Sequence, residues 1–367
     1  TQGLKYIRMF FEYKKVGYLS LNNVYLMNVV YLISNKHKFL AILNKKHQVL
    51  SVLFALTATL LFGQDPEFTQ FYASPLHLNP ALAGTGKCSR ITSTYRNQWP
   101  SIQNAYVTYQ ASFDQYLKNM NGGVGLAFIG DRAADGIYNT MGVSGTYAYR
   151  INFDSDFQLQ AGLQFAYYQK SLNWARLQFG DEFHPIYGYQ GQVSLDRNAN
   201  NRDKVGYSDY AVGLLGLHKS FYAGIAVKHI TEPNESFNTN TLSKLPTRFT
   251  LHGGGIVYLV DRYSEKMILA PEFLYSQQGR FKQLNLGVYW SNQLVVAGIW
   301  ARHTFGNSDA VIPYVGYRKD FFKIAYSYDV TISNLGVQRT AGAHEISLEF
   351  TFCSKNDQQD LVCPRFY

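Results

Sequence analysis

Apolar and polar residues alternate strictly in several long stretches of this chain. From Phe157 to Tyr167, one set of alternate positions is apolar and the other consists mostly of Gln. The same alternation recurs over residues 107–114, 283–290 and 345–352. Because successive side chains of a strand point to opposite faces, the pattern predicts strands with one apolar and one polar face.

Three properties favour a membrane barrel over a soluble sandwich, which would also alternate. The strands are long, at about ten residues, where soluble sheets have about five or six. Their polar face carries mostly uncharged Gln, Ser, Thr, Gly and Tyr, as a crowded lumen would. Short and long connections also alternate along the chain. The sequence therefore predicts an all-β fold, a transmembrane antiparallel β-barrel of about 14 strands.

The strand boundaries follow from the alternation and from the turn residues. We expect strands at 88–97, 104–116, 122–131, 136–150, 156–172, 207–218, 221–231, 246–260, 265–276, 282–291, 293–303, 310–319, 321–330 and 342–353. Tight turns follow the even strands, and longer polar loops follow odd strands, including 173–206, 232–245, 304–309 and 331–341. Short periplasmic turns and an even strand count predict that both termini are periplasmic.

Composition agrees with a barrel and removes one class of partner. The chain holds 29 Tyr and 25 Phe, and only 16% of its residues are charged, which suits aromatic girdles around a lipid-facing band. Residues 1–63 contribute eight basic residues and one acidic residue to the net charge of +9. The excess charge therefore belongs mostly to this leader, and it indicates no nucleic-acid partner.

The leader has the pattern of a signal peptide. A basic stretch, Lys45–His47, precedes the apolar stretch Val49–Phe62, and polarity changes sharply after Gly63. We expect a signal peptide over 45–63 that is cleaved after Gly63; the alternatives are an uncleaved anchor or a buried helix. Residues 1–44 have no clear period, and we expect a spurious or unstructured extension of the leader.

Residues 64–87 differ from the barrel that follows over residues 88–353. They are rich in Pro and Asn and contain Phe68, Phe71 and Tyr72. We expect an irregular periplasmic segment that lies in the periplasmic mouth or plugs the lumen; a disordered linker is the alternative. Residues 354–367 are expected to form a periplasmic tail.

Three cysteines follow the predicted signal peptide. Cys88 opens the first expected strand, Cys353 closes the last, and Cys363 lies in the tail. Closing the barrel brings Cys88 and Cys353 together at the periplasmic rim. A disulfide from Cys363 to either of them, a direct bridge between Cys88 and Cys353, and three free thiols all remain open.

No motif points to catalysis, a metal or a cofactor. His218-Lys219-Ser220 has a spacing that some barrel lipid hydrolases use, but it sits in a tight turn without an obvious acidic partner. Asp181, Glu182 and His184 lie in the longest loop, where a solvated face is a simpler reading than a cation site. The glycine run after His252 is typical of close packing or a bend in a barrel wall. We predict that the protein is not an enzyme.

Several short motifs, in order along the chain, resemble the PorP/SprF family of outer-membrane proteins in the type IX secretion system of Bacteroidetes. The pattern opens with Asp65-Pro-Glu-Phe-Thr-Gln-Phe-Tyr72, Pro75-Leu-His-Leu-Asn-Pro-Ala-Leu-Ala-Gly-Thr85 and Tyr95-Arg-Asn-Gln-Trp-Pro100. Further matches are Gly122-Gly-Val-Gly125, Phe221-Tyr-Ala-Gly224, Tyr326-Ser-Tyr-Asp329, Gly342-Ala-His-Glu-Ile346 and Cys363-Pro-Arg-Phe366. Residue 343 departs from the pattern, with Ala where Ser is expected.

The resemblance implies function and partners that composition does not show. It implies secretion or surface anchoring of a large cargo, such as an adhesin with a type IX C-terminal domain, and gliding motility in some members. It also implies peptidoglycan-linked or secretion-ring components in the periplasm. The alternative function is an outer-membrane channel for a small or hydrophobic solute.

Seven residues are candidate partner contacts under the first function. Arg96, Asn97, Gln98 and Trp99 are expected to form a structured first external turn. Phe68, Phe71 and Tyr72 are expected at the periplasmic mouth. For each set, a purely structural role is the competing interpretation.

Overall fold

A computed structural model describes residues 65–353, apart from 87, 103–105, 154–155, 185, 190, 192–193, 195–200, 262–265, 293, 306 and 334–335. The predicted signal peptide, the extension before it, the C-terminal tail and Cys363 lie outside the described residues.

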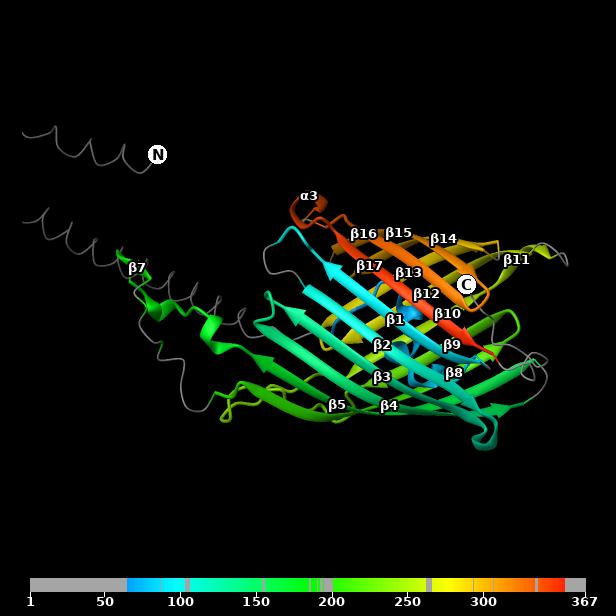
Figure 1. Ribbon diagram of the computed structural model, residues 1–367, viewed down its shortest axis with the longest axis horizontal. Helices are drawn as coiled ribbons and strands as arrows, with labels where there is room; N and C mark the ends of the chain where they lie inside the picture. Colours follow the sequence, from blue (N-terminus) through cyan, green and yellow to red (C-terminus); the bar gives the residue numbers. More distant parts are fainter. Residues whose placement is uncertain are drawn as a thin grey trace, which may run out of the picture. The chain divides into compact units, whose positions relative to one another are not determined.

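Fourteen antiparallel strands close into a barrel, as the alternation predicts (Figure 1). The first strand, β1, pairs with β2 on one side and with the last strand, β17, on the other. β10 and β11 are two halves of one strand, since both pair with β12. The interruption falls at Ile256, directly after the glycine run, where close packing or a bend in the wall was expected. The strands are β1 (Ser89–Gln98), β2 (Tyr106–Leu117), β3 (Gly122–Ala133), β4 (Tyr138–Asn152), β5 (Phe157–Leu172), β8 (Lys204–His218), β9 (Phe221–Lys228), β10 (Arg248–Gly255), β11 (Val257–Asp261), β12 (Lys266–Gln278), β13 (Phe281–Ser291), β14 (Val295–Thr304), β15 (Asn307–Lys319), β16 (Phe322–Thr331) and β17 (Ala343–Phe352).

The alternation separates a lipid-type surface from a polar lumen. In β8, buried and exposed residues alternate along almost the whole strand, and outward positions include Tyr210 and Leu214. Inward positions of the wall carry buried polar residues such as Thr92, Gln110 and Gln160. A closed barrel leaves no backbone edge unpaired, so it can cross a bilayer with its apolar residues outward. No helix in the described part of the chain has the length and apolar character needed to span a membrane.

The two ends of the barrel differ in their connections. At one end, the turn rim, all connections are short: 118–121, 153–156, 219–220, 262–265, 292–294 and 320–321. The other end, the loop rim, holds the long connections 173–203, 229–247 and 332–342. Left-handed backbone at Asn121 and Asp320 fits the tight turns, since Asn and Asp tolerate that conformation. The longest loop carries a small separate hairpin of β6 (Phe183–His184) and β7 (Gly188–Tyr189), and α3 (Val337–Thr340) lies in the last loop.

One predicted loop is wrong. Residues 304–309 were expected to form a long connection, but β14 runs to Thr304 and β15 starts at Asn307. An ion pair of 2.5 Å between Arg302 and Asp309 joins the two strand ends across a bulge. Cross-strand pairing therefore extends both strands into residues whose polarity indicated a loop. The connections 134–137 and 279–280 are also short, so loop length alternates only in part.

Residues 65–86 lie inside the barrel, and we call this segment the plug (blue in Figure 1). It contains η2 (Phe71–Ala73), α2 (Pro75–Leu78) and η3 (Pro80–Leu82), each a single short turn of helix. Its start, Asp65, donates its backbone N–H to Gln278 at the loop-rim end of β12. Near its end, Gly84 donates to Asp114 in the turn-rim half of β2. The plug thus follows the lumen from the loop rim to the turn rim.

Candidate functional site: a plugged lumen

Glycines in the wall make room for the backbone of the plug. A Cβ atom at Gly123 would overlap the carbonyl of Ala83, and one at Gly162 would overlap the backbone of η3 at Ala81. At Gly213, a Cβ atom would overlap the side chain of Asn79. Only glycine allows so close an approach of two backbones. These wall glycines therefore form a groove that fits the turn-rim half of the plug.

Amides and one histidine hold this half of the plug in register. The Asn79 amide donates to the carbonyls of Leu214 and Ile225, both at 3.2 Å, and lies 3.0 Å from Nε2 of His252. Gln160 donates to the carbonyl of Ala83 at 2.7 Å. The bond from Gln160 thus satisfies a plug carbonyl that no regular secondary structure pairs, and those from Asn79 tie the plug to carbonyls of β8 and β9.

A buried ion cluster fixes the next part of the plug, toward the loop rim. Arg96 of β1 pairs with Asp329 at 2.8 Å and with Glu345 at 3.1 Å. Arg302 also pairs with Asp329 at 2.8 Å. All four side chains point into the lumen and are largely buried.

The plug backbone completes the coordination of this ion cluster. The N–H groups of Thr69 and Gln70 both donate to the Glu345 carboxylate at 2.7 Å. The Thr69 hydroxyl donates to Asp329 at 2.8 Å. Buried carboxylates are stable only where partners satisfy most of their oxygens, so the cluster and the plug depend on each other.

A second charged group anchors the start of the plug at the loop rim. Asp65 lies 2.6 Å from Nε2 of His229, whose Nδ1 lies 3.0 Å from Asp209. Arg248 pairs with Glu67 at 2.7 Å. Burial alone would raise the pKa of Asp65, but His229 and Arg248 hold that pKa well below its usual value. Burial alone would lower the pKa of His229, but the carboxylates of Asp65 and Asp209 raise it to about 9.

The aromatic residues predicted at the periplasmic mouth lie inside the lumen instead. Phe71 packs edge-on against Trp300 at 4.9 Å, and Tyr72 packs against Tyr222 at 5.7 Å. Phe68 lies edge-on to His77 at 5.4 Å. Phe68 and Phe71 are both buried. Their role as partner contacts stays a prediction; in this structure their side chains contact the barrel's own residues.

The predicted first external turn starts later than expected. Arg96, Asn97 and Gln98 belong to β1, and Arg96 is 3% exposed because it enters the ion cluster. Trp99 begins the turn with a left-handed backbone, donates to the Gly342 carbonyl at 2.8 Å and packs against Tyr106. Contact of these residues with a partner stays a prediction. Asp329 and Glu345 were not among the predicted site residues, although an acidic residue on an otherwise uncharged lumen face is a signal that the sequence contains.

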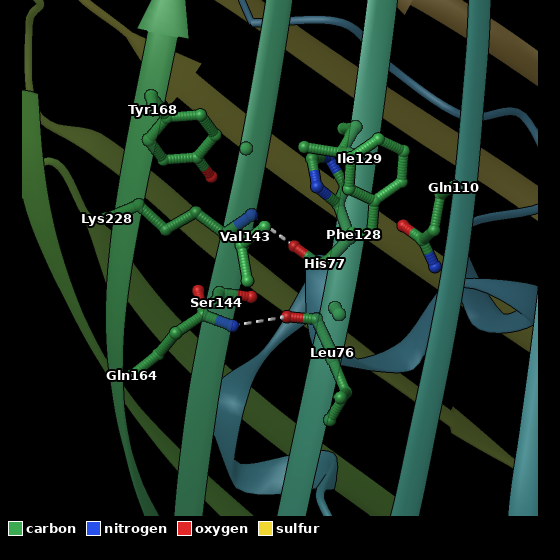
Figure 2. Close-up of a pocket in the computed structure, with 12 residues that line it drawn as sticks. Leu76, His77, Gln110, Phe128, Ile129, Val143, Ser144, Gln164, Tyr168 and Lys228 are labelled. Atoms are coloured by element: carbon green, nitrogen blue, oxygen red, sulfur yellow. Dashed lines mark hydrogen bonds between the residues drawn. The ribbon is translucent and has the colours of Figure 1, made fainter. Parts of the chain in front are cut away.

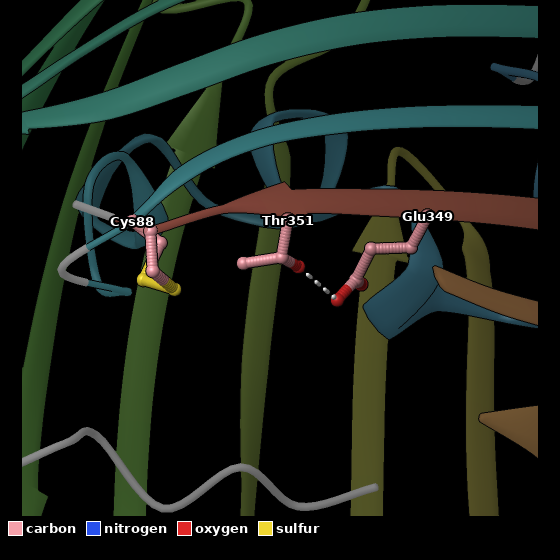
Figure 3. Close-up of a disulfide and its surroundings, with 4 residues drawn as sticks. Cys88, Glu349 and Thr351 are labelled. Atoms are coloured by element: carbon pink, nitrogen blue, oxygen red, sulfur yellow. Dashed lines mark hydrogen bonds between the residues drawn. A yellow bond between two sulfur atoms is a disulfide. The ribbon is translucent and has the colours of Figure 1, made fainter. Parts of the chain in front are cut away.

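The structure selects one cysteine pairing among those left open. Cys88 and Cys353 form a disulfide with a Cα–Cα distance of 4.5 Å, next to Thr351 and Glu349 (Figure 3). The bridge joins β1 to β17 at the turn rim. Because Cys88 follows the plug directly, the bridge also ties the plug's end to both sides of the seam.

The loop residues considered for chemistry have ordinary local roles. Glu182 accepts from the backbone of Phe179 at 3.3 Å, and Asp181 accepts from Ser194 at 3.0 Å. His184 accepts backbone N–H groups of its own hairpin. His218 stacks on Phe221 at 4.5 Å. Among the described residues, no group of three potential ligands could hold a metal ion.

Two cavities lie between the plug and the wall. The larger has a volume of about 60 Å³ and is lined by Asp65, His77 and Lys228, among others. The smaller, of about 20 Å³, shares His77 and Lys228 with it (Figure 2). Figure 2 shows Gln164 donating to the carbonyl of Leu76 and Lys228 donating to that of His77. Cavities of this size hold a few waters or one small solute rather than a polypeptide.

Solved structures with a similar outline are outer-membrane proteins of low identity. Omp33 of Acinetobacter baumannii is 10% identical, with a TM-score of 0.40 over 74% of this chain and 100% of that chain. A FadL homologue of Pseudomonas aeruginosa is 11% identical, with a TM-score of 0.39 over 75% and 92%. The β domain of the Bordetella autotransporter BrkA is 12% identical, with a TM-score of 0.36 over 72% and 99%. No curated protein matches the sequence.

The family comparison is specific. The sequence model of the type IX secretion system membrane protein PorP/SprF matches residues 60–350, which is most of the chain. The matched range includes the plug, the wall glycines and the ion cluster, so it covers the features described above. The chain therefore belongs to the PorP/SprF family of type IX secretion system membrane proteins.

Proposed function

We propose that the protein is a non-enzymatic outer-membrane component of the type IX secretion system that assists secretion or surface anchoring of a large cargo protein, such as an adhesin. The observation that carries the proposal is the plug, which follows the lumen from rim to rim and is tied to the wall along its length. A barrel filled in this way acts through its rims rather than through its interior.

The loop rim offers the surface for cargo. Its longest loop presents the hairpin of β6 and β7, where Ile186 is 80% and Tyr187 is 73% exposed. Exposed aromatic and aliphatic residues of this kind are typical of protein contacts. Cargo with a type IX C-terminal domain is the proposed partner at this rim.

The turn rim is the proposed side for periplasmic partners. Short turns of bacterial barrels face the periplasm, which supports a periplasmic position for the end of β17. Peptidoglycan-linked or secretion-ring components are the proposed partners on that side. The start of the plug, by contrast, lies at the loop rim, so the plug's direction does not support a periplasmic position for Asp65.

A channel for a small or hydrophobic solute is the weaker alternative. Residues of the plug fill the lumen, and the two cavities beside it measure about 60 and 20 Å³. Opening a path would require moving a segment that buries two charged groups and several aromatic rings. Single-channel recording in a planar bilayer tests this alternative, because a stable open pore would support it.

Deleting the gene and measuring the surface display of a neighbouring adhesin tests the main proposal. We expect display to fall while the cellular amount of the adhesin persists, and a plasmid copy of the gene should restore it. Unchanged display in the deletion strain would reject the proposal.

A further inference from the structure

The larger cavity, at the loop rim, has a floor, a wall and a roof. Its floor is the plug at Asp65 and His77. Its wall includes Tyr168 of β5 and Tyr207 of β8, whose rings stack at 5.6 Å. Its roof is loop 229–247.

Two contacts hold loop 229–247 over the cavity. Glu235 of the loop forms an ion pair with Lys170, a lining residue of β5. Phe237 of the loop packs edge-on against Tyr138, a lining residue of β4, at 6.1 Å. The loop is thus a roof that rests on two lining residues, and a ligand would enter from the loop rim.

Most charges around the cavity already have a partner of opposite sign. Lys170 pairs with Glu235, and His229 lies between Asp65 and Asp209. Lys228 and Asp131 also line the cavity, but neither forms such an ion pair in the described part of the chain.

Lys228 forms no direct ion pair within the described part of the chain, although it is 5% exposed and lies in the field of Asp65 and Asp209. Its ammonium group donates to the carbonyl of His77 and has two further N–H groups. Asp131 accepts from the Thr108 hydroxyl at 2.6 Å and forms no direct ion pair among the described residues; the cation that acts on it, Lys170, is already paired with Glu235. The cavity therefore holds one cation and one carboxylate that have no direct ion-pair partner.

Two buried side-chain nitrogens beside this region also lack a partner in the described structure. They are Nε2 of His77, which lines both cavities, and Nε2 of Gln110, which lines the smaller one. In Figure 2 the Tyr168 hydroxyl and the Lys228 side chain approach His77 from the wall. A ligand with several small groups that both donate and accept would satisfy more of these atoms than a simple ion would.

The geometry points to a binding site for one small uncharged polyhydroxyl compound, no larger than glycerol, under loop 229–247. A hydroxyl can accept from Lys228 and another can donate to Asp131, while the stacked tyrosines offer an apolar face. An anion would match Lys228 but meet the Asp131 carboxylate. The volume of about 60 Å³ sets the size limit, because a cavity of about 150 Å³ is what holds a benzene molecule and a sugar ring is larger still.

Saturation-transfer NMR on the full chain in detergent tests the site, with glycerol as the probe. Acetate, inorganic phosphate and glycine are the charged comparators. We expect glycerol to bind and the charged probes to bind more weakly or not at all. In Lys228→Met, the affinity for glycerol should fall about tenfold or more, because a charge-assisted hydrogen bond is lost.

Two further variants separate loss of the site from loss of the fold. Tyr168→Phe keeps the ring stack and removes one hydroxyl, so binding should weaken about threefold to tenfold. Lys219→Met removes an exposed lysine at the turn rim and should bind like the parent. Absence of glycerol binding, equal binding in Lys228→Met, or tighter Lys228-dependent binding of phosphate, acetate or glycine would each overturn the proposal. The site stands independently of cargo display.

Discussion

At Gly162 a single missing Cβ atom decides whether the plug fits the wall. Strand positions normally favour β-branched residues over glycine, so Val would be the better residue for the strand alone. The backbone of Ala81 in η3 occupies the space that any side chain would need. The same reasoning explains Gly213 and also Gly123, which lies in one of the motifs that mark the family resemblance.

We therefore predict that Gly162→Val displaces the plug and lowers the free energy of unfolding by about 1–3 kcal/mol, as overpacking does. The shift is measured as the temperature at which the heat-modifiable gel band changes mobility. Gly145→Val is the matched control, since Gly145 faces outward and a Cβ there meets only Leu126 at 3.9 Å. Equal effects of the two substitutions would contradict the close-packing explanation.

The pair of Asp65 and His229 predicts a pH window for the start of the plug. The pKa of His229 is raised from 6.5 to about 9, so its stabilisation is complete below 6.5 and is lost as pH rises through about 9. The pKa of Asp65 is lowered from 3.8, so its stabilisation is complete above 3.8 and is lost only in stronger acid. Hydrogen exchange of residues near Asp65 should accelerate above about pH 9, and His229→Gln should remove that alkaline step.

At the scale of the element, the strands were predictable and their connections only partly so. Period-two alternation is a local property, and it placed fourteen strands close to their observed bounds. The end of a strand depends on its partner: β14 and β15 continue past the predicted limits because Arg302 and Asp309 pair across them. Neither segment alone contains a sequence pattern that predicts this contact.

The path of the plug depends even more on contacts that the local sequence does not predict. Its aromatic and Pro-rich composition indicated a segment that packs against the barrel. Composition does not predict the direction in which the segment runs through the lumen. Its path is set by glycines and charges from strands far apart in the sequence, such as Arg96 and Glu345. Phe71 and Arg96, two of the predicted partner contacts, are buried against residues of the barrel in this structure, and their contact with a partner stays a prediction.

We predict that Arg96→Met lowers the free energy of unfolding by about 3–5 kcal/mol, because it leaves the buried Glu345 carboxylate without a cation and Asp329 with Arg302 alone. The double variant with Glu345→Gln should recover part of the loss, since the unpaired charge is then removed. Thermal unfolding of both variants provides the measurement. Arg176→Met is the control: Arg176 forms an exposed ion pair with Asp135, and the expected cost is about 0–1 kcal/mol. A loss as small as that of the control would show that the ion cluster does not hold the plug.

At the scale of the whole molecule, the barrel has one covalent tie at one end and ionic ties at the other. The disulfide between Cys88 and Cys353 fixes the seam and the end of the plug at the turn rim. At the loop rim, Asp65 and Glu67 hold the start of the plug by charge. If any part of the plug moves, its loop-rim half is therefore the part free to do so without breaking a covalent bond.

The direction of the barrel in the membrane determines which partners meet which rim. In bacterial barrels the short turns face the periplasm and the longer loops face the cell exterior. We predict that Leu242→Cys, at a loop-rim residue that is 80% exposed, reacts with a membrane-impermeant maleimide on intact cells. Met120→Cys, in η4 (Lys118–Met120) at the turn rim, should react only after the outer membrane is permeabilised.

Both variants are made in a Cys363→Ser background, so that the maleimide labels the introduced cysteine and not Cys363. Labelling of both sites in permeabilised cells controls for reactivity, because each side chain is exposed on the barrel. The reverse pattern on intact cells would place the turn rim outside and exchange the proposed sides for cargo and periplasmic partners. It would also put Asp65 toward the periplasm, since the plug starts at the loop rim whichever way the barrel is inserted.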